Sequence, residues 1–130
     1  MVIEVIISEL DFYLIEKIRE LRIKSKISQM SLAQKIGVSE GYIGNIENHK
    51  QPNKYNIRLL SRTAVALGLK SYIDLFPEKV CSNDIVKIKI ELKERKGKEA
   101  DELLQRFKSI AISPLSEEEI LEYDKKKRKN

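Results

Sequence analysis

The chain has 130 residues and a mass of 15.1 kDa, which fits one domain or one small domain with an extension and excludes a large two-domain enzyme. Charged residues make up 35% of it and the net charge is +5, which favours a soluble protein with an anionic partner, although a solvated basic face would have the same composition. The single cysteine, Cys81, excludes an intramolecular disulfide and indicates a reducing cytoplasm.

The N-terminal residues are apolar but are interrupted by acidic side chains, so neither a signal peptide nor a membrane span is predicted. Apolar residues then recur at helical spacing over residues 11–24, which predicts a first helix. A second, short helix is expected between an N-cap at Ser28 and a stop at Gly37. A third is expected to begin after Ser39, which has the side chain of a good N-cap.

The fourth helix is expected to follow an N-cap at Asn53 and to stop at Gly68, where its apolar face ends. A fifth, very short helix is expected between Ser71 and Pro77. Beyond it, apolar residues no longer recur at helical spacing and instead alternate with charged residues. The sequence therefore predicts a boundary near residues 77–84.

Residues 85–93 alternate between apolar and charged side chains, which predicts a half-buried strand. A lone strand is unstable in water, so this one must pair either with the N-terminal residues 2–7 or with the same strand of a second subunit. Residues 98–111 are predicted to form an amphipathic helix whose apolar positions run from Ala100 to Phe107. A further turn of helix is expected after Ser116, with Glu119 as its capping-box partner.

Residues 28–48 combine several steric features in one short segment. Ala33 is small where two helices would cross, Gly37 allows a tight turn, and Ile43 and Ile46 are placed to pack back against the first of the two helices. With its flanks from about residue 14 to residue 76, the segment resembles the phage-repressor-like (Cro/C1, XRE) family of helix-turn-helix regulators. The resemblance implies a five-helix DNA-binding domain at 11–77. Together with the patterns read above, it predicts a mainly α chain in which a strand-plus-helix extension at 84–124 serves dimerisation or partner binding and a basic tail follows at 125–130.

The resemblance also implies three groups of functional residues. The base-reading positions on the recognition helix, residues 39–48, would be Glu40, Gly41, Tyr42 and Asn45. The phosphate-binding positions would be Gln29, Ser39, Asn48, Lys50, Asn53 and Lys54. The positions that hold the motif together would be Arg22, Ala33, Gly37, Ile43, Ile46 and Glu47, with Arg22 and Glu47 as an internal ion pair.

Some of these positions have two interpretations. Gly41 and Gly44 each cost about 1 kcal/mol relative to alanine in a helix interior. Either they let the backbone approach DNA or the preceding helix, or they are tolerated surface glycines. Glu40 either accepts from a cytosine amine or only complements the helix dipole. His49 replaces a glycine usual in the family and, as the only histidine, has no partner for metal binding or proton transfer.

The favoured function is a sequence-specific, DNA-binding repressor that acts as a homodimer on double-stranded DNA in the cytoplasm. The alternative is an antitoxin-like or adaptor protein whose C-terminal part binds a protein partner. An enzyme is disfavoured, because the sequence has no recognisable nucleophile, metal set or phosphate loop, and no cofactor is expected.

Overall fold

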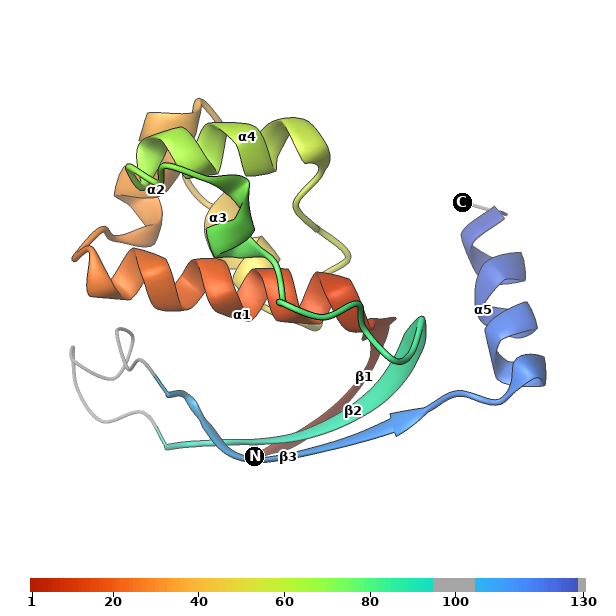
Figure 1. Ribbon diagram of the computed structural model, residues 1–130. Helices are drawn as coiled ribbons and strands as arrows, with labels where there is room; N and C mark the ends of the chain where they lie inside the picture. The colour runs from red at the N-terminus through yellow and green to blue at the C-terminus, as the bar shows by residue number, and fades with distance from the viewer. Residues whose placement is uncertain (95–104, 129–130) are drawn as a thin grey trace.

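The computed structural model describes residues 1–94 and 105–128. A helical layer lies on one side of a three-stranded sheet, and the last helix extends from the end of the sheet (Figure 1). The prediction of a mainly α chain is therefore correct for the helix-turn-helix part, but it did not include the three-stranded sheet. The elements are β1 (Val2–Ser8), α1 (Glu9–Lys24), α2 (Gln29–Ile36), α3 (Tyr42–Glu47), α4 (Ile57–Ala66), the 3-10 helix η1 (Tyr72–Leu75), β2 (Ile85–Leu92), β3 (Phe107–Pro114) and α5 (Glu117–Arg128).

Several helix ends follow the predicted capping residues. The Ser28 side chain accepts from the Ser31 N–H at 3.0 Å at the start of α2, and Gly37 ends α2 with a left-handed φ of 74°. Ser116 and Glu119 form the expected reciprocal capping box at the start of α5, where each side chain accepts from the other residue's backbone N–H.

Two predicted N-caps are wrong. α3 begins at Tyr42 rather than after Ser39, because residues 39–41 form a turn in which the Tyr42 N–H donates to the Ser39 carbonyl. α4 is capped by Asn56, whose side chain accepts from the Leu59 N–H at 2.8 Å. Asn53 is too early because the chain first runs on to bury Tyr55 before the helix starts.

The sheet is antiparallel, with β2 in the middle of the order β1-β2-β3. Val5 stands opposite Ile88, and Ile88 stands opposite Ile112. Of the two predicted pairings for the strand at residues 85–93, the one with the N-terminal residues is confirmed. Because both edges of β2 are already paired, β2 is not available as the contact to a second subunit.

The predicted helix over residues 98–111 is wrong for residues 107–111, which belong to β3; residues 95–104 lie outside the described part of the chain. The apolar spacing of residues 107–111 fits a helix only when the preceding residues of the predicted helix are included in the pattern. From Phe107 onward, Ile110 and Ile112 are two residues apart, and β2 offers them a strand edge to pair with. Tertiary pairing thus overrides a local helical pattern.

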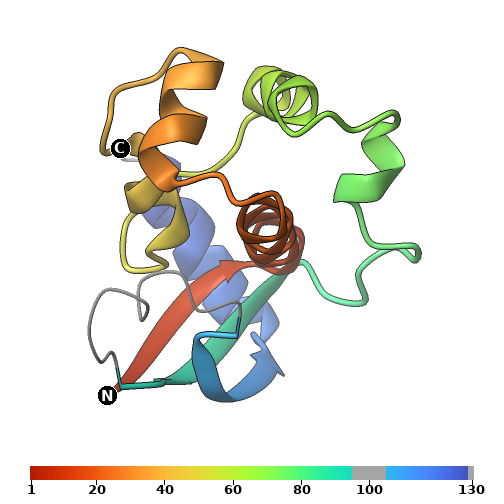
Figure 2. The same cartoon turned by 90° about the vertical axis from the view of Figure 1, so that its left-hand side faces the viewer.

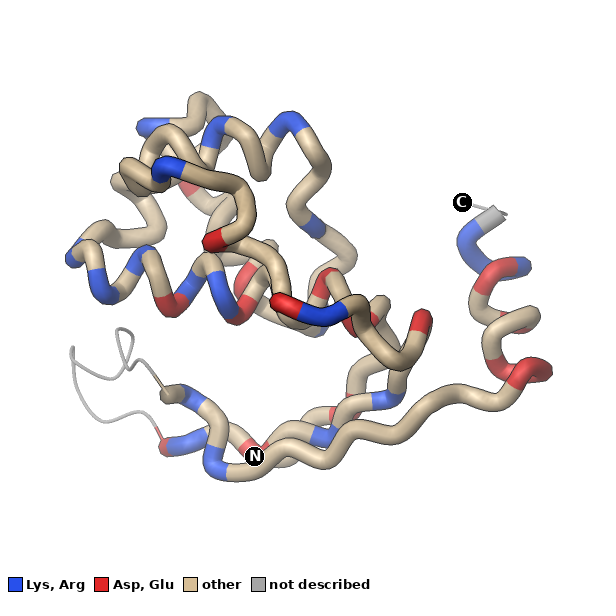
Figure 3. The backbone as a smooth tube through the Cα atoms, in the orientation of Figure 1, with Lys and Arg blue, Asp and Glu red and all other residues tan. Residues whose placement is uncertain are grey.

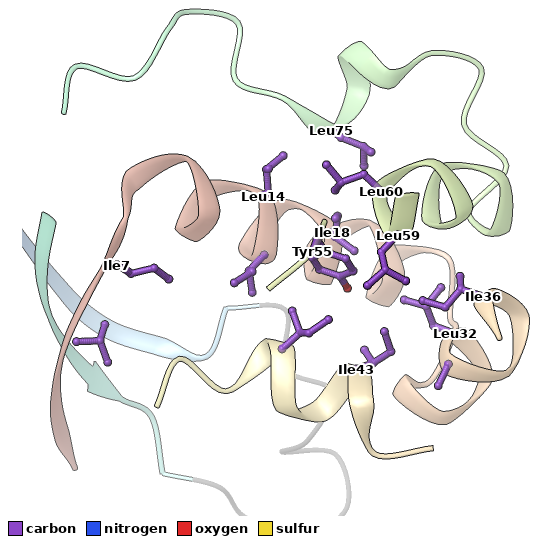
Figure 4. Packing of buried hydrophobic residues seen from close by; sticks show 14 of the residues in the cluster. Ile7, Leu14, Ile18, Leu32, Ile36, Ile43, Tyr55, Leu59, Leu60 and Leu75 are labelled. Carbon is purple, nitrogen blue, oxygen red and sulfur yellow. The ribbon is translucent and has the colours of Figure 1, made fainter. Parts of the chain in front are cut away.

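A single hydrophobic core joins the helices to the sheet. α1 lies against one face of the sheet (Figure 2), and Ile7 of β1 and Leu14 of α1 belong to the same buried cluster (Figure 4). The inward residues of β1 and β2 belong to the same buried cluster as those of α1 to α4. The sheet therefore supports the helix-turn-helix directly.

Candidate nucleic-acid interface

The turn between α2 and α3 places the two helices close together. Ala33 is fully buried between them, and its carbonyl accepts from the Val38 N–H at 3.0 Å just after the left-handed Gly37. Ile43 and Ile46, on the inner side of α3, are also fully buried. These contacts fix one side of α3 toward the core and leave the opposite side free.

The free side of α3 and its flanks exposes the residues that could reach a base or a phosphate. Tyr42 is half-buried. The exposed positions are Ser39, Glu40, Gly41, Asn45, Asn48 and Lys50. Of the four predicted base-reading positions, Glu40 and Gly41 thus lie in the turn before α3, and Tyr42 and Asn45 lie on α3 itself.

The Arg22–Glu47 ion pair fastens this helix from inside. Arg22 Nε donates to Glu47 Oε2 at 2.8 Å and Nη2 donates to Oε1 at 2.9 Å, in a bidentate pair whose side chains are 0% and 1% exposed. Arg22 Nη1 also donates to the Ile27 carbonyl at 2.8 Å. The pair therefore ties α1 both to the end of α3 and to the loop before α2.

Gln29 and Gly44 meet where α2 approaches α3. The Gln29 side-chain amide donates from Nε2 to Glu47 Oε1 at 3.0 Å, and its Oε1 would lie 3.2 Å from a Cβ built on Gly44. Gly44 thus leaves room for the Gln29 side chain in its bonded position, which is a local reason for one of the two glycines. A Cβ on Gly41 would meet nothing within 4 Å, so no contact inside the described chain requires that glycine.

The loop after α3 carries the remaining predicted phosphate-binding residues. Asn48 Oδ1 accepts from the Lys50 N–H at 3.1 Å, which shapes the turn and leaves the Lys50 side chain exposed. Lys54 is half-buried, and its ammonium group donates to the carbonyls of Gln51 and Asn53 at 3.3 and 3.5 Å. Lys50 is therefore better placed than Lys54 to reach an outside anion.

Lys54 also faces Asp11 of α1. Partial burial lowers the pKa of Lys54, against the opposing effect of the Asp11 carboxylate. Partial burial likewise raises the pKa of Asp11, against the effect of nearby Lys54 and Lys127. Desolvation outweighs attraction at both groups, which fits a contact that shields Lys54 from solvent.

A second buried cluster, which the sequence did not predict, surrounds His49. His49 Nε2 lies 2.7 Å from Glu16 Oε2, and Arg106 of the segment before β3 donates to the same Glu16 oxygen. The imidazole, whose side chain is 2% exposed, packs beside the rings of Phe12 and Phe107, with centroids 4.8 and 6.2 Å away, and these two rings also contact each other at 6.2 Å. The cluster joins the loop after α3 to α1 and to the sheet.

The charge of Glu16 is stabilised in this cluster. Burial, the largest single influence, would raise the pKa of Glu16, but the hydrogen bond with His49 and the charge of Arg106 together hold it below 4.5. No sequence signal could have identified the cluster, because Glu16 and Arg106 are 90 residues apart.

Sequence reasoning also missed Arg19 and Arg62. Arg19 lies three residues before Arg22 on α1, and its Nε is 3.6 Å from Glu47 Oε1. The helical i, i+3 spacing could have indicated that both arginines face Glu47. Arg62 of α4 lies directly over Gly37, where it would clash with a Cβ. The flexible end of the Arg62 side chain can move aside, so the positive φ is what requires glycine at position 37.

The comparisons with known proteins agree with this geometry. A family model described as "Helix-turn-helix" matches residues 18–63, which run from α1 through α2 and α3 into α4. Residues 18–63 therefore form a helix-turn-helix, as the sequence predicts. No curated protein and no solved structure matches the chain.

The helix-turn-helix is a common DNA-binding motif, and the match suggests a DNA-binding regulator. Among residues 1–94 and 105–128, no three side chains of histidine, cysteine, aspartate or glutamate are grouped so as to hold a metal ion. Within the same residues, no helix is long and apolar enough to cross a membrane.

Proposed function

We propose that the protein is a cytoplasmic, sequence-specific repressor that places α3 in the major groove of double-stranded DNA as a homodimer. The observation that carries the proposal is the two-sided character of α3: Ile43, Ile46 and Glu47 are buried, whereas Asn45 and the preceding turn are exposed. A recognition helix needs one side held rigidly and the other free for base edges.

Asn45 is the strongest candidate for a base reader, since its amide can pair bidentately with adenine. Lys50 and Asn48 flank it and can contact phosphates from the following loop. The N-terminus of α2 adds the backbone N–H groups of Gln29 and Met30, which lack intrahelical partners. In this proposal Gln29 acts through its backbone, because its side chain is bonded to Glu47.

The rest of the chain has supporting roles in the proposal. Residues 11–77 bind DNA, residues 84–124 supply the contact to the second copy, and the basic residues at 125–130 add non-specific attraction to phosphates. Two copies of α3 would then enter successive major grooves about 34 Å apart on an inverted repeat, and occupancy of a promoter would block transcription.

The test is selection of bound duplexes from a random DNA pool by the full-length protein at near-physiological salt, where non-specific attraction is weak. The expected product is an inverted repeat with half-sites about one helical turn apart. Asn45→Ala should relax the preference at one base pair of each half-site, by about 1–3 kcal/mol of discrimination.

Lys50→Ala is the matched comparison for Asn45→Ala. It should weaken binding to all sequences alike and reduce the salt slope by about 1 for each copy. If wild-type protein enriches no sequence, or if Asn45→Ala leaves the selected site unchanged, α3 is not the base-reading element.

A further inference from the structure

β3 is the outer strand of the sheet, and its free edge has no strand partner among the residues that the structure describes. On the face turned toward the helices, Ile110 and Ile112 continue the rows of Ile90 and Ile88. Ile88 and Ile90 are fully buried, but Ile110 and Ile112 are 44% and 50% exposed. The helical layer therefore covers β1 and β2 and leaves the apolar row of β3 half uncovered.

We propose that β3 pairs antiparallel with β3 of a second copy around a two-fold axis at Ala111. An axis perpendicular to the sheet keeps the inner faces of both copies on the same side and joins them into one six-stranded sheet. In this register Ile110 of each copy stands opposite Ile112 of the other, and Ser109 stands opposite Ser113. The inference rests on the homodimer of the proposed function and specifies its surface.

Charge favours a second copy as the occupant. The central residues of β3, 109–113, carry no charge, so two copies bring no like charges together there. The exposed Lys108 lies at the start of the strand, and the acidic first turn of α5 follows its end. Figure 3 shows the acidic positions at the start of α5. Antiparallel pairing brings Lys108 of each copy toward Glu117, Glu118 and Glu119 of the other.

The other free edge of the sheet is a poorer candidate. On β1, the inward residues Val5 and Ile7 are already buried, so a strand added there would gain mainly backbone hydrogen bonds. On the β3 side, Ile112 lines a cavity of about 570 Å³ together with Phe12 and Val80. Ile110 of the second copy would extend the apolar wall of this cavity. Pairing at the β3 edge would therefore bury more apolar surface than pairing at the β1 edge.

The first measurement is the mass of the full-length protein by sedimentation equilibrium in the absence of DNA. Wild type should be a dimer, and Ile112→Lys should weaken self-association about 100-fold, because the change acts twice across the two-fold axis. Ile73→Lys, at a more exposed apolar side chain on η1, is the control with the same charge change and should remain dimeric. Circular dichroism establishes that each variant is folded, and Ile110→Lys replaces Ile112→Lys if the latter is not.

The second measurement tests the register by disulfide formation in a Cys81→Ser background. Ala111→Cys should form a disulfide-linked dimer on mild oxidation, because position 111 faces itself across the axis. Ser113→Cys, on the same outer face, should not, since its two copies would be about 13 Å apart at 3.3 Å per residue.

A monomeric wild-type protein, or a dimer that Ile110→Lys and Ile112→Lys leave intact, would overturn the proposal. Linking through Ser113→Cys rather than Ala111→Cys would overturn the register. DNA selection is scored separately. A monomer that still selects a half-site would refute this dimer surface but would support base reading by α3. A dimer that selects no sequence would support the dimer surface but would refute base reading by α3.

Discussion

Glu47 and His49 are two residues apart at the end of α3, yet their side chains enter two different buried clusters. Glu47 binds Arg22 and Gln29, which both lie within the helix-turn-helix and its first supporting helix. His49 binds Glu16, whose carboxylate also binds Arg106 at the start of the sheet's third strand. The first cluster holds the recognition helix to its own domain, and the second holds its following loop to the sheet. The DNA-facing surface is thus positioned from two sides.

The largest effect is expected from breaking the first cluster. Glu47→Gln removes the charge that compensates Arg22, whose side chain is fully buried, and should destabilise the protein by about 3–5 kcal/mol. Urea unfolding followed by circular dichroism measures this change. Glu40→Gln, which removes an exposed carboxylate from the turn before α3, is the matched control and should change stability by less than about 0.5 kcal/mol. Equal effects of the two substitutions would show that Glu47 has no special role.

A smaller loss is expected from the second cluster. His49→Ala removes one hydrogen-bond partner of Glu16 and leaves a space beside the rings of Phe12 and Phe107, which should cost about 1–3 kcal/mol. Asn48→Ala, at the exposed neighbouring position, should cost less than about 1 kcal/mol. Equal destabilisation by both substitutions in urea would contradict this prediction, because the loop would then not depend on the contact of His49 with Glu16.

The second cluster should also be visible in the pH dependence of stability. The folded-state pKa of Glu16 lies below 4.5, so its ionised form stabilises the fold above about pH 4.5, and this contribution is lost as the pH falls through the lower folded-state value. Glu16→Gln should therefore be less stable than wild type, by about 1 kcal/mol for a group that is partly exposed. The gap should be present at pH 5 and should close as the pH falls below about 4.5. A gap that widened in acid would contradict the assignment.

The two clusters also show how far the sequence could predict this structure. Arg22, Ala33, Gly37 and Glu47 satisfy local steric and charge requirements within one segment, so the helix-turn-helix could be predicted from it. The contact between His49 and Arg106 arises only after β3 has paired with β2, and no local pattern encodes that pairing. The same reason explains the wrong helix at residues 107–111, where a strand edge decided the conformation.

The smallest effect distinguishes the two interpretations of Gly41. It has an α-helical φ of −85° at the start of α3, and a Cβ there would meet nothing within 4 Å. Gly41 is the N-cap of α3 and alanine can adopt its backbone conformation, so Gly41→Ala should stabilise the protein by about 0.4–1 kcal/mol in urea unfolding by lowering the entropy of the unfolded chain. Gly44→Ala is the control, because its Cβ would lie 3.2 Å from Gln29 Oε1 and should offset the gain in helix propensity.

DNA binding by the same two variants decides the question. If the backbone at Gly41 approaches a base or a phosphate, Gly41→Ala will be more stable than wild type and yet bind the selected duplex more weakly. If Gly41 is only a tolerated surface glycine, stability will rise and affinity will stay the same. The second result would move the closest approach of the recognition helix from its first turn toward Asn45, since no described residue needs the space at Gly41.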